Sequence, residues 1–258
     1  FLGWAVSSAP GSSPDDDFHL ASIWCGLGER PGLCEPAGRD DARMVPKPIT
    51  GITCFVRQAE VGAACWAPDD HGLAEASWLN TDNLYPQGFY ASLAMISTPD
   101  IENSVLKMRA ANALLATLLA TGTFWALPRR WRSVLVIPGF AALVPLGMFL
   151  IPSTNPSSWA IISALITFSA MFGALQTTGK RQFALSTIAA FAGMIGTFAR
   201  TDAGLFAVFA IGVALLASLG RARQPVRIYV VPSIAMIAVA GATLFSFISS
   251  TQGSVAAN

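Results

Sequence analysis

The chain has 258 residues, of which 53% are hydrophobic and only 12% are charged, and its mean hydropathy is +0.53. These values exclude an ordinary soluble globular domain and are typical of a protein that crosses a membrane several times. The formal net charge is +1, but fourteen of the 15 acidic residues lie at or before Glu102. The basic residues are scattered through short loops rather than gathered on one face, so we expect no nucleic-acid partner.

The chain opens with an apolar run that is too short to cross a bilayer alone. We interpret residues 1–10 as the end of a first transmembrane helix. Because the chain begins at Phe1, without an initiator Met or a charged leader, we expect it to be a fragment, and no signal peptide is recognisable.

A dense acidic motif follows, reading Ser13-Pro14-Asp15-Asp16-Asp17-Phe18-His19. Ser13 is suited to cap a helix with Pro14 at its first position, and carboxylates in the first turn complement the helix dipole. Three adjacent carboxylates repel one another, however, and His19 lies on the same helical face as Asp15 and Asp16. We therefore expect a general base or a site for a divalent cation here, with helix capping as the structural alternative. The predicted catalytic residues are Asp15, Asp16, Asp17 and His19.

All four cysteines lie between the acidic motif and the hydrophobic part of the chain, at Cys25, Cys34, Cys54 and Cys65. Four cysteines in an extracytoplasmic loop predict two disulfides, for which three pairings exist. We favour Cys25 with Cys34 and Cys54 with Cys65, because each pair closes a short local ring. A zinc site is the alternative, but no pair has the close spacing typical of such sites.

Residues 11–104 also contain two predicted amphipathic helices. The first follows the acidic motif, and we expect its apolar face to lie on the membrane surface. The second begins at Tyr85-Pro86, and we expect it to present Phe89, Tyr90, Leu93 and Ile96 to the bilayer. Between them, we expect residues 28–48 to be irregular and residues 49–57 with 61–66 to form a hairpin.

Six later segments have the length and apolarity of membrane-spanning helices, which need about 20 residues. They lie at 110–127, 133–151, 159–175, 183–199, 205–219 and 228–249. Basic residues concentrate in alternate connecting loops, namely Arg129, Arg130 and Arg132, then Lys180 and Arg181, then Arg221, Arg223 and Arg227. The positive-inside rule then puts residues 11–104 outside the membrane. We predict an all-α integral membrane protein, with a six-helix membrane region at 105–258.

Four polar residues should share the outer face with the acidic motif. They are Arg109, Asn155, Arg200 and Asp202. Each has a simpler alternative, because Arg109 can snorkel to the interface, Asn155 can cap a helix, and Arg200 can pair with Asp202. Their convergence on one face nevertheless predicts substrate binding, since arginines beside carboxylates suit a lipid phosphate and an acceptor hydroxyl.

These motifs resemble a family of bacterial membrane proteins catalogued as domain of unknown function 2142. The resemblance rests on the acidic motif, Tyr85-Pro86, the start of the span at Arg109, Asn155-Pro156-Ser157 and Arg200-Thr201-Asp202, and it covers nearly the whole chain. The family is in turn similar to GT-C glycosyltransferases, which take sugars from polyprenyl-phosphate carriers outside the membrane. The resemblance implies a GT-C-like helical bundle in the bacterial plasma membrane, with a large first exoplasmic loop that begins at an acidic base or metal ligand. The three adjacent acids and the cysteines depart from the GT-C pattern.

Two classes of function therefore compete. One is a glycosyltransferase that uses a polyprenyl-phosphate-linked sugar, and the other is a non-enzymatic membrane protein, either a transporter or a scaffold for envelope assembly. A transporter is expected to carry ionisable residues near the middle of its spans. The predicted spans after Ala110 carry no such residue in their interiors. That favours chemistry at the membrane interface.

Overall fold

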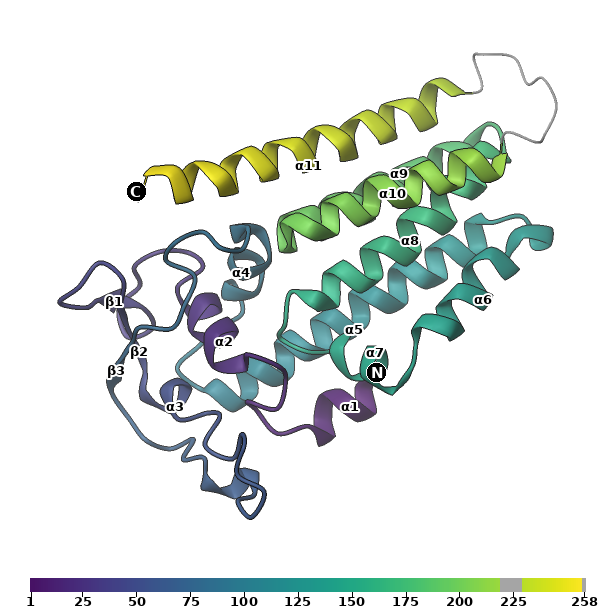
Figure 1. The fold of residues 1–258 in the computed structure, drawn as a ribbon. Coiled ribbons are helices and arrows are strands. Elements are labelled where there is room, and N and C mark those ends of the chain that lie inside the picture. The colour runs from purple at the N-terminus through teal and green to yellow at the C-terminus, as the bar shows by residue number, and fades with distance from the viewer. Residues whose placement is uncertain (219–228, 257–258) are drawn as a thin grey trace.

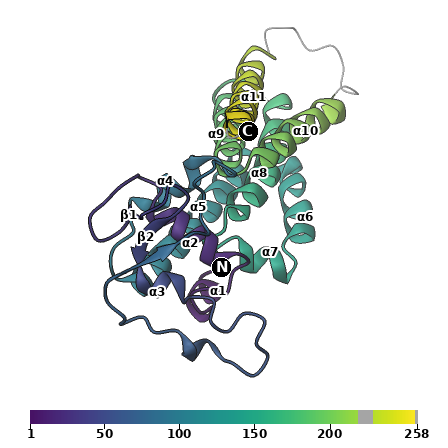
Figure 2. The ribbon, with the colours of Figure 1, turned by 60° about the vertical axis from the view of Figure 1, so that its left-hand side comes forward.

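The computed structural model describes residues 1–218 and 229–256. The predicted basic loop with Arg221, Arg223 and Arg227 lies outside these residues. Long helices run side by side, and a smaller region with a sheet and short helices covers one end of them (Figure 1). In the turned view of Figure 2 the sheet, α2 and α4 again lie together at that end. The region containing the disulfides and the acidic motif thus caps one end of a helical bundle.

The bundle contains α5 (Ile101–Ala126), α8 (Ser157–Leu175), α9 (Lys180–Ala199), α10 (Thr201–Ser218) and α11 (Val230–Ala256). Within the described residues, four helices are long and apolar enough to cross a membrane: α8, α9, α10 and residues Val230–Ser250 of α11. Most residues in the apolar spans of α8 and α9 are buried inside the protein. In the spans of α10 and α11 only 28% of the residues are buried. The exposed faces of α10 and α11 are apolar and suited to contact lipid.

Small residues allow α9, α10 and α11 to approach closely. A Cβ atom added at Gly193 would lie 2.7 Å from the Val239 side chain, and one added at Gly204 would lie 2.8 Å from Thr243. Membrane helices associate through such close packing because lipid removes most of the hydrophobic driving force between them.

The first two predicted membrane segments differ from expectation. The helix α5 begins at Ile101, where the Asp100 side chain accepts a hydrogen bond from the Asn103 N–H, and it includes the buried polar residues Arg109 and Asn112. Residues 133–151 form α6 (Ser133–Ala142) and α7 (Pro145–Leu150) instead of one helix, after a short 3-10 turn, η2 (Arg129–Trp131). Pro145 explains the break, because proline disfavours helical geometry in the residue before it and cannot donate to the preceding turn. None of these segments is among the four apolar helices of span length.

The region at the end of the bundle is not entirely helical, which corrects the all-α prediction. Three antiparallel strands in the order β1 (Glu35–Pro36), β2 (Arg43–Pro46) and β3 (Leu73–Ala76) form a small sheet. Around it lie α1 (Leu2–Ser7), α2 (Asp16–Trp24), α3 (Lys47–Thr50), η1 (Ala63–Cys65) and α4 (Gln87–Ala94).

The hairpin predicted at 49–57 and 61–66 is wrong. Residues in that stretch form α3, turns and η1, and β2 pairs with β3 instead. Ile49 and Ile52 are both fully buried and are three positions apart. That spacing places both side chains on one side of a helical turn, whereas a strand would point them to opposite faces.

The membrane-facing role predicted for the two amphipathic helices is also wrong. The side chains of Trp24 in α2 and of Phe89 and Tyr90 in α4 are completely buried within the protein. The helix α4 packs between α2 and α9, and a Cβ atom at Gly88 would lie 2.6 Å from the Phe198 Cβ atom. An amphipathic pattern specifies a buried face, and here protein rather than lipid covers it.

Both predicted disulfides are present. Cys25 is bonded to Cys34, and Cys54 is bonded to Cys65. The first joins the end of α2 to the residue that precedes β1, and Cys34 is buried. The second closes the exposed segment between α3 and η1.

Candidate functional site

Asp16 is the buried member of the acidic motif. Its Oδ1 atom accepts a hydrogen bond from the Thr154 Oγ1 hydroxyl at 2.7 Å, and its Oδ2 atom accepts one from the Ser13 backbone N–H at 3.1 Å. The Arg109 guanidinium lies 3.9 Å from the same Oδ2 atom. Burial raises the pKa of Asp16 to about 6, outweighing the opposing effects of Thr154 and Arg109.

The hydrogen bond from its backbone N–H makes Ser13 a partner of Asp16 rather than the predicted helix cap.

The other two carboxylates of the motif have different surroundings. Asp15 is exposed and precedes α2 with a left-handed backbone (φ 55°), and Asp17 is half-buried. Within the described residues, no three His, Cys, Asp or Glu side chains come together in a way that could hold a metal ion. The acidic motif thus divides into one buried carboxylate that holds the local fold and two that solvent can reach.

Arg109 is buried rather than extended to the membrane interface. It donates hydrogen bonds to the backbone carbonyl oxygens of Ser8 and Ala9, the latter at 2.9 Å. These bonds hold the segment after α1 against α5. The sequence predicts Arg109 as a substrate-binding residue, and in the structure its guanidinium contacts these carbonyl oxygens and the Asp16 carboxylate.

Asn155 connects the acidic motif to α8. Its Nδ2 group donates to the Pro14 carbonyl oxygen at 2.9 Å, and its Oδ1 atom accepts from the Ser157 N–H at 2.8 Å. The second bond is the capping interaction that the sequence predicts. Sequence reasoning missed its neighbour Thr154, and it missed Asn112, which accepts a hydrogen bond from the Trp159 indole. A lone amide in an apolar segment was the available signal for Asn112, because such a group needs a partner when buried.

His19 faces two tyrosines, Tyr90 in α4 and Tyr85 just before that helix. Its Nδ1 atom lies 2.9 Å from the Tyr90 hydroxyl, and its ring packs edge-on against Tyr85. Burial lowers the pKa of His19 to about 3, with a further contribution from the positive charge of Arg200. Burial also raises the pKa of Tyr90. His19 is therefore a neutral hydrogen-bonding residue at physiological pH, and sequence reasoning did not foresee its two tyrosine neighbours.

Arg200 and Asp202 form the most accessible charged pair of the site. Two hydrogen bonds of 2.9 Å join the Arg200 Nε and Nη2 groups to the two oxygens of Asp202. The Arg200 Nη1 group donates to the Ser157 hydroxyl at 3.1 Å, and the guanidinium lies 5.5 Å from the centre of the Tyr85 ring. The side chains of Arg200 and Asp202 are 29% and 49% exposed. Contacts through Asn155, Ser157, Tyr85 and His19 thus connect the predicted residues at this end of the bundle.

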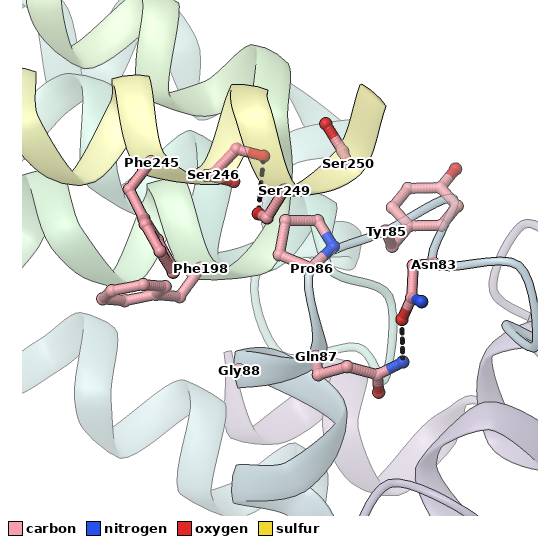
Figure 3. A pocket seen from close by; sticks show the side chains of 10 residues that line it. All are labelled: Asn83, Tyr85, Pro86, Gln87, Gly88, Phe198, Phe245, Ser246, Ser249 and Ser250. Atoms are coloured by element: carbon pink, nitrogen blue, oxygen red, sulfur yellow. Dashed lines mark hydrogen bonds between the residues drawn. The ribbon is translucent and has the colours of Figure 1, made fainter. Parts of the chain in front are cut away.

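A cavity of about 370 Å³ adjoins this cluster. Figure 3 shows Tyr85, Pro86, Gln87 and Gly88 on one side of it, with α11 crossing above. The lining contributed by α11 is Phe245, Ser246, Ser249 and Ser250, and α9 contributes Phe198. Tyr85 belongs both to this cavity and to the surroundings of Arg200, so the two features are continuous.

The family described as "Predicted membrane protein (DUF2142)" matches residues 1–256. The chain belongs to this family. No curated protein and no solved structure matches the chain significantly.

Membership of DUF2142 and the four apolar helices together identify an integral membrane protein. The disulfides indicate that the region at the end of the bundle is extracytoplasmic, because such bonds persist in oxidising compartments. The Arg200 cluster and the cavity lie at this same end of the DUF2142 protein, beside α4 and the disulfide-bearing region.

Proposed function

We propose that the protein is a membrane glycosyltransferase that moves a sugar from a polyprenyl-phosphate donor to a cell-envelope acceptor at the outer face of the bacterial plasma membrane. The observation that carries the proposal is the position of Arg200. It is an accessible guanidinium, oriented by Asp202 and Ser157, at the end of a membrane helix and beside a cavity. A lipid-linked phosphate would reach the protein at this level of the membrane.

Arg200 is suited to bind the donor phosphate. A guanidinium carries five N–H donors, and the bonds to Asp202 and Ser157 use three of them. Two remain for phosphate oxygens, and the three existing bonds fix the plane of the group in advance. Arg109 is a weaker candidate, because it is buried and bonded to backbone carbonyls. We assign Arg109 a positioning role beneath the acidic motif.

Asp17 and Asp15 are the proposed bases, since solvent reaches both of them. In the proposed reaction the acceptor oxygen attacks the anomeric carbon and the bond from that carbon to the phosphate oxygen breaks. The acceptor proton passes to the carboxylate, and polyprenyl phosphate leaves with the bonding electrons. Asp16 and His19 hold the two candidates in place, because both are buried at the start of α2.

Purified protein in liposomes with a radiolabelled polyprenyl-phosphate sugar and an extract of envelope acceptors tests the proposal. A general base contributes about 10²- to 10⁴-fold to rate, so Asp17→Asn or Asp15→Asn should lower transfer by that factor with little change in stability. Arg200→Ala should weaken donor binding, and Arg200→Lys should restore it only in part, because lysine cannot form the bidentate contact. Glu102→Gln is the matched control, since Glu102 is exposed on α5.

Transfer that persists unchanged in all the Asp15, Asp17 and Arg200 variants would refute the enzymatic proposal. A scaffold for envelope assembly would then be the better explanation, and the largely exposed apolar helices α10 and α11 favour it. In that case, the partner proteins that co-purify with the wild type from detergent-solubilised membranes should also co-purify with these variants.

A further inference from the structure

The cavity between α4, α9 and α11 combines polar, uncharged side chains with an apolar side. The polar residues that line it are Ser246, Ser249 and Ser250 of α11 together with Asn83, Tyr85 and Gln87, and the buried Ser246 hydroxyl donates to the Thr197 carbonyl oxygen of α9. Among the lining residues that the structure describes, none has an acidic or basic side chain. Such a lining does not compensate an ionic charge, and it matches a neutral ligand that carries several hydroxyl groups.

The serine side chains are arranged to accept hydrogen bonds from a ligand. Ser249 donates its hydroxyl proton to the Ser246 carbonyl oxygen at 3.0 Å, and Ser250 donates to the Phe247 carbonyl oxygen at 3.0 Å. Each hydroxyl has a single proton, so a ligand meets oxygen lone pairs at these positions. Gln87 uses one N–H of its amide on Asn83, at 3.1 Å, which leaves a second N–H as a donor. The cavity therefore offers acceptors on α11 and a donor at the start of α4.

The cavity also has an apolar side. In Figure 3, Phe198 and Phe245 lie together at one side of it, whereas Asn83 and Tyr85 lie at the other. Phe198 is near the end of α9 and Phe245 is in α11, and both side chains are exposed on the protein. Both helices have the length and apolarity of membrane spans. The apolar side is thus continuous with surface that lipid tails would cover, and the polar side faces the extracytoplasmic region.

We infer that this cavity binds the head group of a neutral glycolipid, with the sugar between Tyr85, Gln87 and the serines of α11 and the tail leaving past Phe198 and Phe245. If the proposed function holds, this glycolipid is the acceptor, because the donor phosphate has its own partner in Arg200, whose guanidinium lies 5.5 Å from the centre of the Tyr85 ring. Binding itself depends only on the cavity and requires no catalysis.

A photoactivatable monoglucosyl diacylglycerol, with a diazirine near the start of one acyl chain, tests the inference on the full chain in nanodiscs. Peptide mapping should find the adduct on the ends of α9 and α11, near Phe198 and Phe245. Ser249→Trp fills the cavity and should lower the yield of adduct about tenfold. Leu244→Trp is the matched control, because Leu244 is exposed on α11 and does not line the cavity, and it should label as the wild type does.

Further comparisons test whether the labelling depends on this cavity. Gln87→Ala should also lower labelling, and because it removes side-chain atoms, it tests the site even if Ser249→Trp fails to fold. Phosphatidylglycerol with the same photoactivatable chain should label α9 and α11 weakly in the Arg200→Ala variant, where the nearby guanidinium is absent and the described lining residues carry no charge to pair with its head group. Equal labelling by the two lipids in that variant, or glycolipid labelling that Gln87→Ala and Ser249→Trp leave unchanged, would overturn the inference. Arg200→Ala should leave glycolipid labelling intact, so a failure of the transfer assay alone would count only against the enzymatic proposal.

Discussion

Asp16 and Arg109 form an ion pair in which both members are buried. The Asp16 Oδ2 and Arg109 Nη2 atoms are 3.9 Å apart, and the side chains are 0% and 4% exposed. The pair joins the first turn of α2 to α5, and Arg109 also holds the backbone after α1. Arg109 thus links α2, α5 and the backbone after α1 beneath the accessible carboxylates. These contacts fix the positions of Asp15 and Asp17 relative to the helical bundle.

Breaking this pair should be costly. In Arg109→Gln the Asp16 carboxylate loses its counter-charge while buried, which typically costs about 3–5 kcal/mol. Thermal unfolding in detergent should show a much lower Tm for this variant than for Arg39→Gln. Arg39 pairs with Asp41 on the surface, where such pairs contribute little. The double variant Asp16→Asn with Arg109→Gln should recover part of the loss, and a Tm as low as that of Arg109→Gln alone would show that Arg109 acts mainly through the backbone carbonyls.

His19 and Asp16 should give the folded state opposite pH dependences. Burial lowers the pKa of His19 from 6.5 to about 3, so its contribution to stability is complete above pH 6.5 and is lost as the pH falls toward 3. Burial raises the pKa of Asp16 from 3.8 to about 6, so its contribution is complete below pH 3.8 and is lost as the pH rises through 6. Over the shared range the two effects oppose each other.

Single variants should separate these effects. With Asp16→Asn only the His19 effect remains, so the Tm should fall more steeply than in the wild type as the pH is lowered from about 6.5 to about 4. With His19→Gln the Asp16 effect remains, and the Tm should fall less steeply or rise over the same range. The control is His71→Gln, which removes the other histidine of the chain at an exposed position. Wild-type slopes in both site variants would contradict the assignment.

Several residues of this site could be placed from the sequence because they lie at the ends of helices. The apolar segments fix which residues follow each membrane helix, so Asn155, Arg200 and Asp202 could be placed at one face before any contact was known. The disulfide pairs were predictable for a similar reason, since the rings that they close span only 9 and 11 positions.

The contacts that arise from tertiary packing could not be predicted in this way. His19 and Tyr90 are 71 positions apart, and no local pattern links them. The strands β1, β2 and β3 have only two to four residues, which is too short for an alternating pattern to be recognised. The apolar faces of α2 and α4 were assigned to lipid because amphipathicity does not distinguish a membrane from a protein core.

The two disulfides should differ in their importance. Removing Cys25 and Cys34 together, as alanines, should destabilise the protein by about 2–5 kcal/mol, because this bond fixes the buried end of α2 beside the sheet. Replacing Cys54 and Cys65 should cost less, since that bond closes an exposed segment outside the core. Non-reducing peptide mapping followed by thermal unfolding measures both. A larger loss from the second pair would show that the exposed segment supports the core more than its burial suggests.

The orientation of the protein can be tested at the two ends of α5. Glu102 lies in the first turn of this helix and Arg130 lies just after it, and both residues are exposed. The 26 residues of α5 extend about 39 Å at 1.5 Å per residue, which exceeds the hydrocarbon thickness of about 30 Å. A cysteine at position 102 should therefore react with a membrane-impermeant maleimide in intact cells, whereas one at position 130 should react only after permeabilisation. The native cysteines are paired and should not react within the described chain. Labelling of both positions from the same side would show that α5 does not cross the membrane, and the Arg200 cluster would then have to be placed from the orientation of α8 and α9 alone.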